Sequence, residues 1–300
     1  MAFRAPDYER FEGALSQRPP WWPIWRATFR RGWNSKWIRM ITIGSFFMAF
    51  GLTVFIYGVQ SVAPGWIENL RQAGRQAGGG PDFNFNGSFY LILLKLQVFP
   101  FMLPLAMLLG YDLISGDLRS NAFESYFSRS ITPWGYVFGR TLAYAGYLLA
   151  VTLLPLLWIW LLDVMTAAEG HFSEVSGVPL GLAAGMTLVA LTLSLFIQAL
   201  TTITRSGVWT GLLLAVLFFL SSAIAGILYE NTRDPRMLAL AFWENIHVVA
   251  NGFLGFPGGV RGHPPFGLSF GLLLTVLFGS LFLLLARIRR SGTVGGRAPP

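Results

Sequence analysis

Cysteine is absent from this chain, and charged residues are scarce. Without cysteine, the chain can form no disulfide, thiolate metal site or cysteine nucleophile. Charged residues make up 12% of the sequence and hydrophobic residues 54%, whereas soluble domains carry roughly 25% charge. Composition alone therefore places the chain among membrane proteins.

Motifs for catalysis are missing as well. The two lysines, Lys36 and Lys95, do not follow glycine, which excludes the Gly-Lys-Ser/Thr core of a phosphate-binding P-loop. The sequence has no HExxH motif, and His171, His247 and His263 fall in segments predicted to be outer loops. A buried Ser–His pair needs a histidine at membrane depth, and none is predicted. We therefore expect no enzyme activity of its own, no bound cofactor and no metal.

Six apolar stretches each reach the roughly 20 residues that a bilayer requires. They are predicted at 40–60, 89–110, 132–162, 175–204, 206–229 and 263–286. Thr132-Pro133 has the pattern of a helix start, a capping hydroxyl followed by proline in the first turn. No acidic residue is predicted well inside a stretch, which argues against a proton-coupled carrier. The predicted fold class is an all-α polytopic membrane protein with six transmembrane helices.

Basic residues predict the orientation of these helices. With both termini cytoplasmic, the inner segments hold sixteen Lys and Arg residues and the outer segments five. This asymmetry follows the positive-inside rule. The net charge of +8 is then explained by topology, and no nucleic-acid partner is expected.

The N-terminal arm, residues 1–39, combines basic residues with tryptophan. Trp22, Trp25, Phe29 and Trp33 are spaced at three and four, so they share one helical face. A basic helix with such a face is typical of the headgroup region of a membrane. The pattern predicts an interfacial helix, and the alternative is a tryptophan belt just before the first span. The transmembrane domain is predicted at 40–287 and a disordered cytoplasmic tail at 288–300.

The outer segment 230–263 carries its own helix signals. Asp234-Pro235 is a helix-start pattern. Apolar residues then follow at three and four spacing, namely Met237, Leu238, Ala241, Phe242 and Ile246. The pattern predicts one or two short amphipathic helices that re-enter the outer leaflet. The alternative is a surface loop with a single short helix.

A few polar residues interrupt the predicted spans. Lys95, Gln97 and Gln198 are candidates for a substrate path, because polar groups within membranes are functional candidates by default. Lys95 can instead extend its amine toward the outer interface, and Gln198 can instead hold helices together. Prolines within the second and third spans favour kinks; they are Pro100, Pro104 and Pro155.

The segment between the second and third spans differs from the rest in being short, charged and aromatic. Residues 115–140, SGDLRSNAFESYFSRSITPWGYVFGR, resemble the signature loop of ABC type-2 transporter permeases. Asp117 stands at the acidic position and Glu124 matches the family's glutamate. Asn121-Ala122 replaces the family's Gly-Thr, and Arg129 stands where proline is common. Gly139-Arg140 matches the closing pair.

The resemblance implies a function and partners. It implies an exporter subunit in a bacterial or archaeal cytoplasmic membrane, whose loop 111–135 forms a coupling helix that docks on a separate ATPase. The residues expected to make that contact are Asp117, Arg119, Phe123, Glu124, Tyr126, Phe127 and Arg129. A homodimer, or a pair with a related permease, would work with two ATPase copies that hold ATP and Mg²⁺. The alternative function is a membrane scaffold or mechanotransmitter that anchors an ATPase and acts on other proteins.

Overall fold

The structure, a computed structural model, describes residues 19–62, 87–110, 131–166, 171–204, 206–255 and 263–294. These residues are almost entirely helical and include no strand. Six of their helices are long and apolar enough to cross a membrane. The chain is therefore a multi-pass membrane protein of the all-α class, as its composition predicts.

The second of the six spans is a broken helix. The six are α2 (Lys36–Val62), the series α4 (Gly87–Gln97), η1 (Val98–Met102) and α5 (Leu103–Gly110), then α8 (Pro133–Thr166), α10 (Val178–Thr204), α11 (Gly207–Thr232) and α13 (Phe266–Val294). The middle piece, η1, is π-helical and contains Pro100. Proline lacks a backbone donor, and π-helical turns accommodate such interruptions of the α-helical ladder. The irregular second span agrees with the kink that its prolines predict.

Four shorter helices complete the described chain. They are α1 (Trp22–Asn34), α9 (His171–Val175), the 3₁₀ helix η2 (Pro235–Leu240) and α12 (Phe242–Phe253). The outer segment thus contains two short helices, rather than a loop with a single one. Residues 245–251 of α12 are all buried, so this helix is packed inside the protein instead of lying on its surface.

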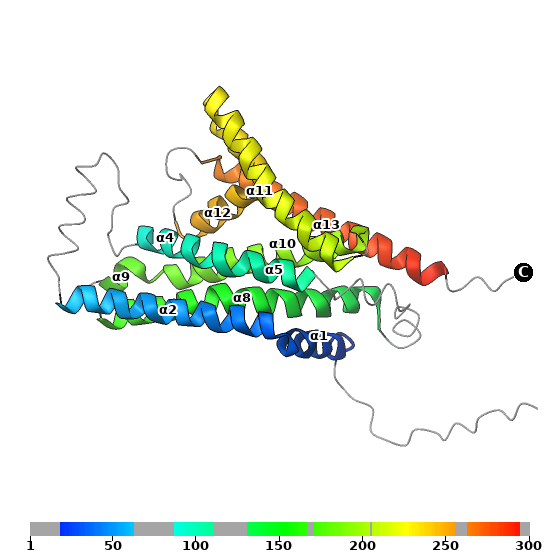
Figure 1. Cartoon of the computed structure of the whole chain (residues 1–300), viewed down its shortest axis with the longest axis horizontal. Helices are drawn as coiled ribbons and strands as arrows, with labels where there is room; N and C mark the ends of the chain where they lie inside the picture. Colours follow the sequence, from blue (N-terminus) through cyan, green and yellow to red (C-terminus); the bar gives the residue numbers. More distant parts are fainter. Residues whose placement is uncertain are drawn as a thin grey trace, which may run out of the picture.

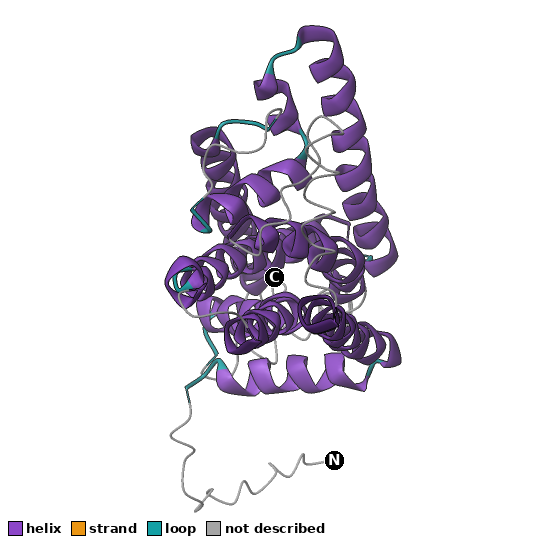
Figure 2. Cartoon of the chain, turned by 90° about the vertical axis from the view of Figure 1, so that its left-hand side faces the viewer, coloured by secondary structure: helices purple, strands orange, loops and turns teal. Residues whose placement is uncertain are grey.

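The helices α8 and α10 form the centre of the bundle. They pack against each other, and α10 also contacts α5, α11, α12 and α13, while α8 contacts α1 and α2. In Figure 1, α2, the α4–α5 pair, α8 and α10 run along one another, and α11 diverges from them. Figure 2 shows α1 running across the ends of these helices. The α1 helix and the C-terminal end of α13 lie at the same end of the bundle, as an even number of crossings requires.

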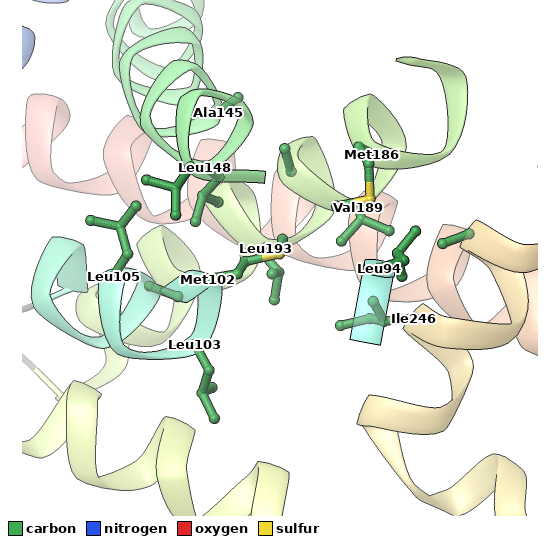
Figure 3. Close-up of a cluster of buried hydrophobic side chains, with 14 of the residues drawn as sticks. Leu94, Met102, Leu103, Leu105, Ala145, Leu148, Met186, Val189, Leu193 and Ile246 are labelled. Carbon is green, nitrogen blue, oxygen red and sulfur yellow. The ribbon is translucent and has the colours of Figure 1, made fainter. Parts of the chain in front are cut away.

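Two close contacts bring the short helix α12 into this bundle. Figure 3 shows Ile246 of α12 beside Leu94 of α4 and Val189 of α10. Further along α12, its C-terminal end packs on Gly181 and Gly185, which lie one turn apart on α10. A Cβ atom at Gly181 would overlap a backbone carbonyl of α12. Small residues let helix backbones approach closely in membranes, where packing rather than hydrophobicity drives association.

One helix boundary differs from the sequence-based expectation in a way that matters. The third span was expected to end before Asp163, but α8 continues to Thr166 and Asp163 is only 2% exposed. Asp163 is therefore buried in the last turn of α8, instead of following the end of the third span. The physical reason is Tyr90 of α4, whose hydroxyl donates a 2.7 Å hydrogen bond to Asp163 Oδ2. Separately, α13 continues to Val294, past the predicted start of the tail at residue 288.

Candidate functional site

The predicted coupling segment is described only at its two edges. Residues 111–130 lie outside the described residues, so the structure says nothing about the predicted contact residues Asp117, Arg119, Phe123, Glu124, Tyr126, Phe127 and Arg129. At the near edge, α5 ends at Gly110, where a Cβ atom would lie 3.1 Å from Ile197 and 3.2 Å from Thr210. At the far edge, Thr132 Oγ1 accepts a 3.1 Å hydrogen bond from the Gly135 N–H. The predicted helix start at Thr132-Pro133 is thus confirmed.

The first turns of α8, which follow this segment, are the docking surface for α1. A Cβ atom at Gly139 of α8 would lie 2.7 Å from the carbonyl oxygen of Trp21, so the two backbones are nearly in contact. Two turns further on, the ring of Tyr147 lies against Gly32 of α1. Phe29 of α1 stacks on Tyr147 at 4.7 Å between ring centroids. The N-terminal helix is therefore fixed to the helix that follows the predicted coupling segment.

The pair Gly139-Arg140, which the resemblance singled out, lies at this contact. Arg140 is 4% exposed, and its guanidinium carbon lies 4.8 Å from the ring centroid of Tyr136, one turn earlier in α8. A cation over an aromatic face gains electrostatic stabilisation that grows as water is excluded. Gly139 thus allows the close approach of α1, while Arg140 is buried beside Tyr136 in the same turns of α8.

Gln97, a candidate for the substrate path, is buried between three helices. Its Nε2 donates to the Val151 carbonyl of α8 at 2.8 Å and also to Ser45 Oγ of α2. Ser45 Oγ itself donates to the same carbonyl at 2.6 Å. Pro155 lies four residues after Val151 and has no N–H for that carbonyl. Ser45 and Gln97 therefore replace the missing helical hydrogen bond with donors from α2 and α4.

The other two path candidates lie in different surroundings. Gln198 of α10 is 1% exposed, and its Nε2 donates to Thr141 Oγ1 of α8 at 2.9 Å and to the Ser194 carbonyl at 3.0 Å. Such contacts are those of a residue that holds two helices together. Lys95 of α4 is exposed; that its amine extends toward the outer interface stays a prediction. A substrate path through Lys95, Gln97 and Gln198 stays a prediction.

A polar cluster that the sequence did not reveal surrounds α12. His263, just before α13, has its Nδ1 2.9 Å from Glu244 Oε2, and this hydrogen bond lowers the pKa of Glu244. His247, one turn after Glu244, is 1% exposed, and neither of its ring nitrogens has a hydrogen-bond partner among the described residues. Burial and the nearby Lys95 ammonium lower the pKa of His247 to about 4. We refer to Lys95, Glu244, His247 and His263 as the α12 cluster.

The placement of His247 corrects the expectation that every histidine lies in an outer loop. Its neighbour Trp243 packs edge-on against the imidazole at 4.4 Å between ring centroids. The spacing of Glu244 and His247 by three residues was the available signal, since that spacing puts both on one helical face. Within the described parts of the chain, no group of three or more His, Cys, Asp or Glu residues could hold a metal ion.

A cavity of about 210 Å³ opens between α2 and α8, near Asp163. Its lining is mostly apolar and consists of Thr53, Tyr57, Ile159, Leu162, Asp163 and Thr166. This cavity lies at the opposite end of the bundle from α1. It is therefore separate from the contact between α1 and α8.

Comparison with known proteins adds no assignment. No protein-family model matches the chain, and no curated protein matches it.

Proposed function

We propose that the chain is the permease subunit of an ATP-binding-cassette exporter in a bacterial or archaeal cytoplasmic membrane. It would act as a homodimer with two copies of a separate ATPase, which would hold ATP and Mg²⁺. The resemblance of residues 115–140 to the permease signature loop carries this proposal. The two lysines of the sequence exclude a P-loop in this chain, so the energy must come from a partner.

The surroundings of residues 111–130 support this reading. The segment starts where α5 packs on α10 and α11, and ends where α8 begins. Both edges lie at the end of the bundle that carries α1. A force applied to the segment would therefore reach α8 and α5 directly. Because α8 is a central helix with contacts to α1, α2 and α10, it is suited to pass such a movement to the rest of the membrane domain.

Copurification from the native host tests this proposal. A tagged chain should retain an ATPase of the ATP-binding-cassette type, and reversing charge in Asp117→Lys/Glu124→Lys should remove it. Charge-assisted contacts contribute about 1.5–3 kcal/mol each, so two reversals should weaken binding by at least about 100-fold. Glu230→Lys/Asp234→Lys is the matched control, since it makes the same charge change around the C-terminal end of α11, far from the edges of the 111–130 segment.

Two outcomes would contradict the proposal. Failure of the wild-type chain to retain any ATPase would remove its basis. Equal loss of the ATPase in the control variant would show that net charge, rather than the 111–130 segment, determines binding. An ATPase that is retained with further proteins, but moves no substrate in reconstituted vesicles, would favour the scaffold instead.

A further inference from the structure

Five basic side chains belong to α1 and to the first turn of α2. All five are exposed, and they are Arg26, Arg30, Arg31, Lys36 and Arg39. The buried side of α1 is formed by Ile24, Thr28 and Gly32, which face α8. Arg26 and Arg30 lie one turn apart, so their guanidinium groups share one face. We call these five residues the cationic face.

The described protein offers this face no acidic partner. The sequence from residue 19 to residue 62 contains no Asp or Glu, and neither do the α8 residues 133–147 that pack against α1. The acidic side chains that the structure describes belong to the far end of α8 and to the region from the end of α11 to α12. They are Asp163, Glu230, Asp234 and Glu244. The positive charge of the cationic face is thus not neutralised by these residues.

Two exposed tryptophan side chains accompany the cationic face. Trp33 is 45% exposed and Trp37 is 52% exposed, and both lie next to its basic residues. The Nζ of Lys36 lies 5.4 Å from the ring centroid of Trp37. Tryptophan concentrates at the level of the lipid headgroups. Figure 2 shows that α1 runs across the bundle, so it lies along the membrane surface when the six spans cross the bilayer.

From these observations we infer that the cationic face binds anionic phospholipid headgroups in preference to zwitterionic ones. Arginine guanidinium groups match the geometry of phosphate oxygens. Clusters of four to eight Lys and Arg residues beside a transmembrane helix attract anionic lipid. An anionic headgroup carries the net negative charge that the described protein does not supply here. This inference goes beyond the proposed function, because it holds whether the chain transports a substrate or anchors other proteins.

Native mass spectrometry of the whole purified chain tests the inference. Delipidated protein in detergent is titrated with phosphatidylglycerol or with phosphatidylcholine of the same acyl chains, and the bound lipids are counted. Wild type should retain phosphatidylglycerol preferentially. Arg26→Gln/Arg30→Gln should weaken that preference about fivefold for each charge removed. Arg233→Gln/Arg236→Gln removes two exposed arginines at the other end of the bundle and should leave the preference unchanged.

Three results would overturn the inference. They are equal retention of the two lipids by wild type, an unchanged preference in the α1 variant, and an equal loss in the control variant. If the glutamine variant does not fold, the wild-type protein still tests the inference. Its preference must weaken as salt is raised, because exposed charges are screened, and Arg26→Lys/Arg30→Lys must keep it. A preference that is insensitive to salt would also contradict the inference.

Discussion

The Val151 carbonyl of α8 offers a direct test of how the bundle is held together. It loses its helical donor because of Pro155, and it accepts hydrogen bonds from Ser45 Oγ and Gln97 Nε2 instead. If these side chains replace the missing N–H, their contribution to the free energy of unfolding must depend on Pro155. Restoring the N–H with Pro155→Ala should make both side chains less important for stability.

The expected free energies follow from the geometry. Interhelical hydrogen bonds in membranes contribute about 0.6 kcal/mol on average, so Ser45→Ala and Gln97→Leu should each cost about 0.5–1 kcal/mol. Either single variant leaves one donor on the Val151 carbonyl. The double variant leaves none, and a buried group without a partner costs about 1–3 kcal/mol. The double variant should therefore lose about 2–4 kcal/mol, which is more than the sum of the single variants.

Unfolding by SDS titration in mixed micelles measures these differences. In the Pro155→Ala background, the loss in the double variant should fall by about 1–2 kcal/mol, since an alanine N–H can donate to the Val151 carbonyl. Gln198→Leu is the matched control, because Gln198 donates to Thr141 Oγ1 and the Ser194 carbonyl, neither of which lacks a donor through a proline. Its cost should be the same in both backgrounds. Purely additive losses, unaffected by Pro155→Ala, would refute the reasoning.

Two further variants test the contact of α1 and the α12 cluster. Gly139→Ala places a Cβ atom 2.7 Å from the Trp21 carbonyl oxygen, while Gly146→Ala on the same helix meets open space. Both variants gain about 1 kcal/mol in helix propensity, but only Gly139→Ala pays the overpacking cost of about 1–3 kcal/mol. In SDS titration, Gly139→Ala should therefore be less stable than Gly146→Ala by about 1–3 kcal/mol. Equal stabilities of the two variants would contradict the close contact. The pKa of His247 is lowered to about 4 by burial, whereas an unfolded histidine titrates near pH 6.5. The unfolded chain then binds the extra proton, and stability should fall by up to about 3 kcal/mol as pH drops from about 6.5 to 4. Stability measured against pH should lose this slope in His247→Leu. A slope that persists in that variant would show that another group causes it.

The number and class of the spans were predictable, because the signal lies within each stretch of sequence. A run of about 20 apolar residues needs no knowledge of its neighbours to be recognised as a span. The end of the third span was not predictable in this way. A carboxylate is costly in a membrane, so the sequence placed Asp163 outside. The hydroxyl that makes its burial possible belongs to Tyr90, which lies 73 residues earlier in the chain.

The α12 cluster shows the same limit for polar side chains. The apolar spacing around Ile246 predicted a short helix, and the structure has one. Its depth depends on Gly181 and Gly185 of α10, which allow the close approach of α12. Nothing in the local sequence around His247 shows that this approach occurs. The local sequence therefore predicts an outer-loop position for His247, although the residue is buried within the bundle.

Gln97 and Pro155 show how the sequence and the structure together explain a polar residue in a span. The sequence identified Pro155 as a source of a kink and Gln97 as a candidate for a substrate path, without relating one to the other. Their relation is the Val151 carbonyl, which the proline leaves without a donor and which Gln97 reaches from another helix. A polar residue in a span is thus best compared first with the backbone groups that prolines expose in neighbouring helices. By that comparison Gln97 has a structural role, and Gln198 has its own partners on α8 and α10. Lys95, the exposed member of the three, is then the residue with which a search for a substrate path should begin.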